Sequence, residues 1–201
     1  CCLGKDASNV SISNVLASPP SSGVPFNANL VRLPFYGSPY LHDPGTMRKD
    51  GGSYFMYGDG TGITGLTSSD LRNWSSATAV FPSGPPSWIT NSVPGQGGGN
   101  YFWAPDTAYF NGLWHMYYTY SVFGTIDSVI GVATSPSLTN ASWTDQGKVV
   151  KSYSPATADT DTTAYNCIDP SIFVAANGTV WMSYGSYSSG ILVTQIDPTT
   201  G

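Results

Sequence analysis

Short aromatic segments recur along the chain and predict β-strands. Three of them follow a glycine-bearing turn and carry a methionine four residues after the turn glycine, at residues 54–57, 114–117 and 181–184. Each is followed by a segment of glycine and branched apolar residues that predicts a further strand, at residues 62–63, 130–132 and 190–193. No stretch keeps the 3.6-residue hydrophobic period of a helix. The pattern therefore predicts an all-β fold.

An aspartate next to a proline introduces each of these three units. Asp43, Asp106 and Asp169 follow one another at a spacing of 63 residues. A period of this size, built from several short strands, is typical of propeller blades, and a radial repeat brings one carboxylate per blade towards a common centre. The alternative is that each aspartate fixes blade geometry through hydrogen bonds to the backbone. We keep this structural interpretation for Asp106.

The chain is too short to close a propeller of this kind. Closure needs at least four blades, and the 201 residues supply barely three at the observed period. An open array would leave a bare blade face and exposed strand edges. We therefore expect residues 1–201 to form a single, incomplete catalytic β-propeller domain, completed by a further polypeptide segment or chain.

Two long connections lack any strand pattern, at residues 82–100 and 151–163. Loops of this length in compact domains are often functional. We expect both to line a site. Residues 29–33 are a further candidate strand.

Composition and charge narrow the class of protein. Only 9% of residues are charged and 13% are aromatic, which is typical of a folded domain rather than a disordered chain. The net charge of −5 offers no basic surface, so nucleic acid and membrane are not expected partners. Four Asn-x-Ser/Thr sequons favour a secreted, extracellular protein: Asn9, Asn73, Asn140 and Asn177.

The three cysteines leave the disulfide pairing open. Cys1 and Cys2 could bridge to another segment, pair with each other or stay free, whereas Cys167 is expected to be a small buried side chain. No pair of cysteines has the spacing of a zinc site, so no metal site is predicted from them.

Carboxylates that converge in one pocket can carry out acid–base chemistry. Neighbouring carboxylates shift each other's pKa, so that one can act as a base while another stays protonated as an acid. Glycoside hydrolysis needs such a pair, and aromatic side chains such as Trp103 and Phe123 suit the faces of sugar rings.

The motif series along residues 41–201 resembles glycoside hydrolase family 43. It comprises Leu41-His42-Asp43-Pro44, Trp103-Ala104-Pro105-Asp106, Tyr120-Ser121-Val122-Phe123-Gly124, Ile130-Gly131-Val132-Ala133-Thr134-Ser135 and Tyr165-Asn166-Cys167-Ile168-Asp169-Pro170. Within the family it is most similar to the endo-1,5-α-L-arabinanases. The resemblance implies a five-bladed β-propeller, of which this chain supplies roughly the first three blades. It also implies hydrolysis of arabinan and arabino-oligosaccharides, plant cell wall polysaccharide chains of α-1,5-linked L-arabinofuranose, with inversion of configuration.

The resemblance also assigns roles to individual residues. It makes Asp43 the general base, and it gives Asp169 the role of orienting the substrate and raising the pKa of the general acid. That acid is a glutamate in the family and would lie outside this chain, which has no glutamate at all. The substrate-binding residues it implies are His42, Trp103, Phe123, Asn166 and Ser186. It further implies a calcium ion at the propeller axis, with ligands mostly outside this chain. His115 is expected to be structural.

Two alternatives remain open. An exo-acting α-L-arabinofuranosidase or β-xylosidase could use the same fold, with a blocked pocket in place of an open groove. A non-catalytic carbohydrate-binding propeller is the other, suggested by the missing acid. A glutamate across the pocket from Asp43 would favour the enzyme.

Overall fold

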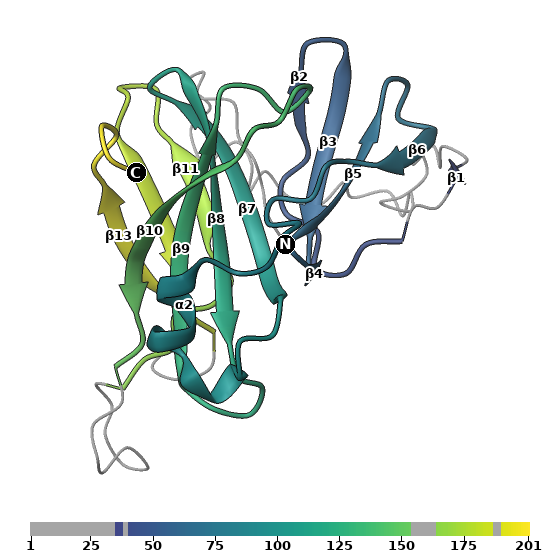
Figure 1. Ribbon diagram of the computed structural model, residues 1–201. Coiled ribbons are helices and arrows are strands. Elements are labelled where there is room, and N and C mark those ends of the chain that lie inside the picture. The colour runs from purple at the N-terminus through teal and green to yellow at the C-terminus, as the bar shows by residue number, and fades with distance from the viewer. Residues whose placement is uncertain (1–34, 38–39, 154–163, 187–189) are drawn as a thin grey trace, which may run out of the picture.

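The computed structural model describes residues 35–37, 40–153, 164–186 and 190–201, and the candidate strand at residues 29–33 lies outside them. The described residues form three sheets (Figure 1). The first sheet has the order β1 (Tyr36–Gly37), β6 (Asn73–Ser76), β5 (Thr64–Ser68), β3 (Ser53–Gly58) and β2 (Arg48–Asp50). The second has the order β10 (Thr144–Lys151), β9 (Ser128–Ser135), β8 (Leu113–Ser121), β7 (Tyr101–Phe110) and β4 (Gly60–Thr61). The third consists of β11 (Ser171–Val174), β12 (Val180–Tyr184) and β13 (Leu192–Ile196).

The sheets stand side by side as consecutive blades, with the second between the other two (Figure 1). Strand β7 contacts both β3 of the first blade and β11 of the third. All strand pairs are antiparallel except β1 with β6, which is parallel. The predicted aromatic strands are β3, β8 and β12, each of which pairs with a strand on both sides, and we call them the middle strands of the blades.

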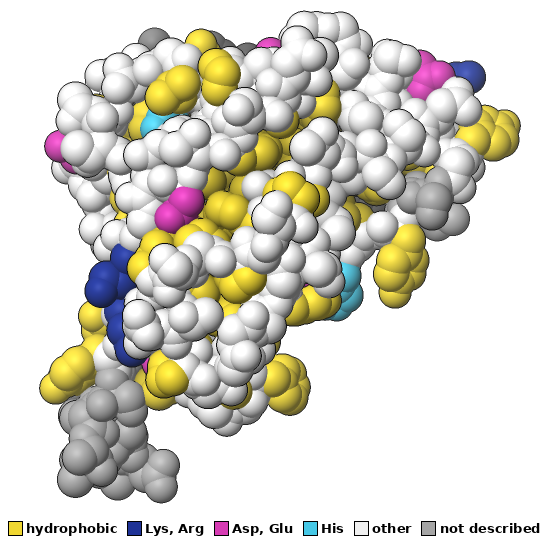
Figure 2. Space-filling model, viewed as in Figure 1, with side chains coloured by type: hydrophobic (Ala, Val, Ile, Leu, Met, Phe, Trp, Pro, Cys, Tyr) yellow, Lys and Arg dark blue, Asp and Glu magenta, His cyan; other side chains and the backbone are white. Residues whose placement is uncertain are grey.

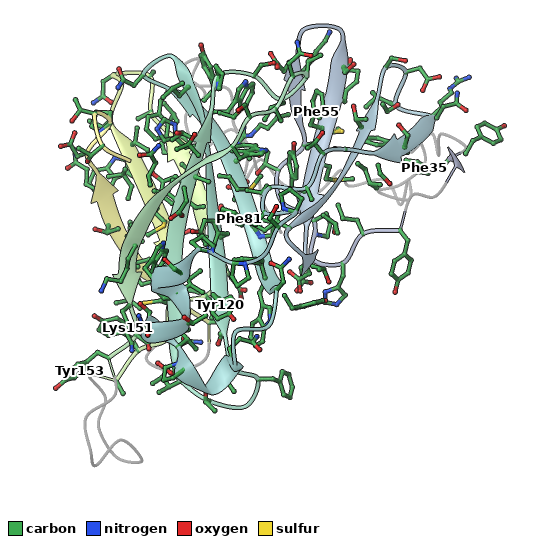
Figure 3. All side chains as sticks on the ribbon, in the orientation of Figure 1. Phe35, Phe55, Phe81, Tyr120, Lys151 and Tyr153 are labelled. Atoms are coloured by element: carbon green, nitrogen blue, oxygen red, sulfur yellow. The ribbon has the colours of Figure 1, made fainter. Side chains whose placement is uncertain are left out.

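Two apolar cores hold the blades together. The core between the first and second blades includes Phe55, Phe81 and Tyr120, which lie in the interior of the molecule (Figure 3). The core between the second and third blades includes Ile130 and Met182. The second blade is thus covered on both faces, and every residue of β9 is buried.

The outer face of the third blade has no such cover among the described residues. Phe173, Trp181 and Val193 are 56%, 37% and 66% exposed. Cross-strand pairing places Phe173 opposite Trp181, on the face that points away from the second blade. Apolar side chains on one sheet face normally pack against another layer.

The strand boundaries differ from those predicted in two blades. Gly62 and Ile63, predicted as strand, have φ of 69° and 60°, and β5 begins only at Thr64. A left-handed backbone cannot continue a strand. The predicted strand at residues 190–193 likewise begins at Leu192. The connection at 82–100 contains two short helices, α2 (Ser87–Ser92) and η1 (Pro94–Gln96), which are too short to show a helical period.

Asp106 connects all three blades. Its carboxylate accepts hydrogen bonds from the backbone N–H of Thr46 (3.1 Å), Thr107 (2.9 Å) and Ile172 (2.8 Å), which belong to the first, second and third blades. The residue is 4% exposed, and Arg48 beside it donates to the Thr107 carbonyl. The structural interpretation of Asp106 is confirmed, although the residue lies within β7 rather than at its start.

Candidate active site

The segment that carries Asp43 is fastened to the end of β3. The Gly45 N–H donates to the Tyr57 carbonyl (2.8 Å), and the Asp59 N–H donates to the His42 carbonyl (2.9 Å). The two backbones are so close that a Cβ at Gly58 would lie 2.3 Å from the His42 carbonyl oxygen. Glycine at this position therefore lets the segment approach the strand.

Asp43 itself has an unusual backbone and an accessible side chain. Its φ is 41°, a left-handed value that non-glycine residues rarely adopt and that is often found at functional sites. Its side chain is 56% exposed, and its Oδ2 lies 3.4 Å from Nδ1 of His42. The carboxylate is thus open to solvent and contacts one imidazole.

Asp59 is a second aspartate beside His42, and sequence reasoning missed it. Its side chain is only 7% exposed, its Oδ2 lies 3.2 Å from His42 Nδ1, and it accepts a hydrogen bond from the Ala104 N–H. Burial raises the pKa of Asp59, and the hydrogen bonds from Ala104 and His42 oppose that rise. It is not one of the three repeated aspartates; the signal available was a carboxylate two residues after the predicted strand at 54–57.

Asp169 joins this group from the third blade. It also has a left-handed backbone, with φ of 55°, and its N–H donates to Thr119 Oγ1 (3.2 Å). Loss of hydration raises the pKa of Asp169, and the negative charges of Asp43 and Asp59 raise it further. The structure therefore brings three carboxylates close enough for their charges to interact.

The aromatic residues predicted to bind sugar lie next to each other. The rings of Trp103 and Phe123 have centroids 6.4 Å apart and are tilted by 58°. Phe123 is 90% exposed. Strand β7 has one extra residue between Trp103 and Asp106 relative to β8. Such a bulge changes the direction in which nearby side chains of the strand point.

Asn166 and Ser186 also meet. Asn166 is buried, and its Oδ1 accepts a hydrogen bond from the Ser186 N–H (3.3 Å), while Ser186 is exposed. Their contact with substrate stays a prediction. Cys167, next to Asn166 in the sequence, is a buried free thiol, as expected, and burial raises its pKa to about 12.

His115 packs inside the second blade, as predicted. It is 3% exposed and stacks on Phe110 with ring centroids 3.7 Å apart. Burial lowers the pKa of His115. This histidine is therefore structural.

The described residues do not by themselves form a calcium site. The one group of potential ligands found among them is His42, Asp43 and Asp59, whose donor atoms lie within 4.8 Å of one another. Calcium prefers six to eight oxygen ligands, and the hydrogen bond of His42 to Asp59 already accounts for this arrangement. A calcium ion at the propeller axis remains a prediction that relies on ligands from elsewhere.

Comparisons with known proteins identify the family of the chain. The sequence model described as "Glycosyl hydrolases family 43" matches residues 37–201. The chain belongs to glycosyl hydrolase family 43. The resemblance noted in the sequence is thereby confirmed.

Individual relatives within family 43 are arabinan-degrading enzymes. The chain is 40% identical over 164 residues to "Extracellular endo-alpha-(1->5)-L-arabinanase 1" of Bacillus subtilis, which covers 80% of this chain and 47% of the relative. It is 35% identical over 155 residues to "Extracellular exo-alpha-(1->5)-L-arabinofuranosidase ArbA" of Cellvibrio japonicus, which covers 75% of this chain and 42% of the relative. The chain thus spans less than half the length of these two curated relatives.

The solved structure "GH43 Endo-Arabinanase from Bacillus licheniformis" superimposes with a TM-score of 0.74 at 36% identity. The match covers 84% of this chain and 55% of that structure. The three sheets are therefore blades of the five-bladed family-43 propeller, and the predicted fold class is confirmed.

Proposed function

We propose that this chain is the first part of a secreted endo-1,5-α-L-arabinanase that hydrolyses arabinan with inversion of configuration. The observation that carries the proposal is the accessible Asp43 carboxylate, held beside His42 and electrostatically coupled to Asp169. Membership of family 43 and the similarity to arabinan-degrading relatives support the substrate class.

In the proposed reaction, Asp43 removes a proton from a water molecule as its oxygen attacks the anomeric carbon. The glycosidic C–O bond breaks, and a general acid donates a proton to the leaving oxygen. An inverting pair needs about 6.5–9.5 Å between the two carboxyl groups, which leaves room for the water. The exposure of Asp43 supports this role, because the water must reach its carboxylate.

Asp169 would orient the substrate and keep the general acid protonated. A negative charge near a second carboxyl group raises the pKa of that group. The carboxylates of Asp43 and Asp59 already have this effect on Asp169 itself. The same electrostatics would act on an acid brought to the pocket.

The general acid would be a glutamate from a further polypeptide segment that completes the propeller. Two observations support this: the chain spans less than half of its curated relatives, and the outer face of the third blade exposes Phe173, Trp181 and Val193. A fourth blade would bury this apolar face.

Trp103 and Phe123 would form a stacking platform for arabinofuranose rings, and His42, Asn166 and Ser186 would provide hydrogen bonds. Exo action on the same chains is the second candidate, because the Cellvibrio japonicus relative is named an exo-arabinofuranosidase. Endo and exo action differ in whether the groove is open at both ends.

Secretion of this chain is supported by relatives named extracellular. Among the described residues, no helix is long and apolar enough to cross a membrane. Figure 2 shows Lys and Arg side chains at only a few places on the face in view, so this face offers anionic partners little attraction.

The test is hydrolysis of linear 1,5-arabinan by the full-length protein. We expect a mixture of oligosaccharides early in the reaction, and ¹H NMR of the first products should show an inverted anomeric configuration. Asp43→Ala should lower turnover by about 10²–10⁴-fold, which is the usual contribution of a general base. Release of single arabinose units from the start would favour exo action.

The matched control is Asp197→Ala, which removes an exposed carboxylate in the C-terminal turn. It should leave turnover unchanged. Near-normal activity of Asp43→Ala would refute the role of Asp43. Oligosaccharide binding without any turnover by the wild type would favour a carbohydrate-binding propeller.

A further inference from the structure

Asp59 connects two parts of the candidate site through one buried carboxylate. Oδ1 accepts the hydrogen bond from Ala104, next to Trp103, and Oδ2 faces Nδ1 of His42, next to Asp43. Trp103 is the predicted sugar-binding residue, and Asp43 is the predicted general base. A charged group this buried is costly unless it has partners, and here it has two.

The equivalent position in the second blade shows which of the two Asp59 contacts needs a charge. Counted from the methionine of each middle strand, Asp59 and Thr119 occupy equivalent positions, three residues after Met56 and Met116. Thr119 Oγ1 accepts the N–H of Asp169, a left-handed residue of the next blade, just as Asp59 accepts the N–H of Ala104, which is left-handed with φ of 31°. A neutral hydroxyl therefore suffices for the link between blades.

The negative charge of Asp59 is therefore needed for its other contact, the one with His42. His42 Nδ1 lies 3.2 Å from Asp59 Oδ2 and 3.4 Å from Asp43 Oδ2, so one ring nitrogen stands between two carboxylates. An ionised carboxylate only accepts hydrogen bonds. Nδ1 must therefore carry a proton, and Asp59 fixes both the tautomer and the direction of the ring.

We propose that Asp59 is a positioning residue whose carboxylate holds the His42 imidazole against Asp43 and so orients the base for the attacking water. The inference rests on the proposed function. Asp43 needs such support because its backbone is left-handed and its side chain is largely exposed. In this proposal His42 orients the general base Asp43, in addition to the sugar-binding role that the family resemblance implies.

The decisive variant is Asp59→Asn. The amide oxygen can still accept the Ala104 hydrogen bond, but the amide nitrogen presents a donor to His42. A donor facing Nδ1 requires an acceptor there, so the proton should move to Nε2. The ¹⁵N chemical shifts of the His42 imidazole in the full-length protein report which nitrogen carries the proton. His115, the other histidine of this chain, is the internal control, and its ¹⁵N shifts should not change.

Kinetics on arabinan separate the two contacts. With Asp59→Asn, we expect kcat to fall about tenfold, as one hydrogen bond to a charged group is lost, while KM stays within about twofold because the link to the Trp103 strand remains. Asp59→Ala removes both contacts and should also raise KM. Urea unfolding of both variants checks that the fold is retained.

The outcomes distinguish this inference from the proposed function. Arabinan turnover with an unchanged His42 spectrum and unchanged kcat in Asp59→Asn would overturn the role of Asp59 alone. A stability loss without any change in kcat would do the same. No turnover by the wild-type protein would overturn the proposed function and the positioning role together.

Discussion

Asp106 and Asp43 belong to the same series of aspartates spaced by 63 residues but have opposite surroundings. Asp106 is buried and receives three backbone hydrogen bonds, one from each blade. Asp43 is exposed, has a left-handed backbone and contacts one imidazole. Asp169 resembles Asp43 in its backbone and exposure. The 63-residue spacing therefore does not decide the role of a carboxylate, whereas the number of N–H donors around it separates a structural carboxylate from a chemical one.

The largest effect is expected from removing the buried member of this comparison. Asp106→Ala leaves the buried N–H groups of Thr107 and Ile172 and the part-buried N–H of Thr46 without their acceptor. It also deprives Arg48 of a nearby negative charge. Each unsatisfied buried donor costs about 1–3 kcal/mol, so the two buried donors predict a loss of at least about 2 kcal/mol in the free energy of unfolding. Urea denaturation of the full-length protein measures it.

Asp43→Ala provides the contrast in the same measurement. An exposed carboxylate without backbone donors should change the free energy of unfolding by less than about 0.5 kcal/mol. Equal destabilisation by the two substitutions would break the distinction between them.

A smaller effect is expected from Trp103, which lies in the same strand as Asp106 but on the other side of the bulge. Trp103→Ala should raise KM for arabinan about tenfold, because a stacking ring contributes a kcal/mol or more. The fold should persist. Tyr109→Ala, at an exposed aromatic residue of the same strand, is the matched control, and an unchanged KM in Trp103→Ala would return this ring to a structural role.

The smallest expected effect is the pH dependence of the stability change caused by Asp169→Asn. Because the pKa of Asp169 is raised in the folded state, its ionisation opposes folding: its favourable contribution is complete below the unfolded pKa of about 3.9 and is lost as pH rises through the folded value. Asp169→Asn should therefore raise the urea midpoint relative to wild type at pH 7 but not near pH 3. A midpoint difference that does not change with pH would contradict the electrostatic origin of the shift.

The sequence predicted the blades because their pattern is local. Aromatic strands, turn glycines and the repeated aspartates lie close together in each unit, and all three middle strands were found. The pattern did not show that Gly62 and Ile63 are left-handed, because their backbone hydrogen bonds go to residues distant in the sequence, such as Phe81 and Asn100. It also missed Asp59, since Ala104 is 45 residues away and the equivalent position of the next blade holds Thr119 rather than a carboxylate.

The hydrogen bonds of Asp106 also order events during synthesis. The Thr46 N–H leaves the ribosome 60 residues before Asp106, whereas the Ile172 N–H follows 66 residues after it. Oδ2 of Asp106 therefore has no Ile172 N–H to accept until the third blade has begun to emerge. The first two blades can associate during translation, but they cannot bury Asp106 with all its partners until the nascent chain has grown by another blade.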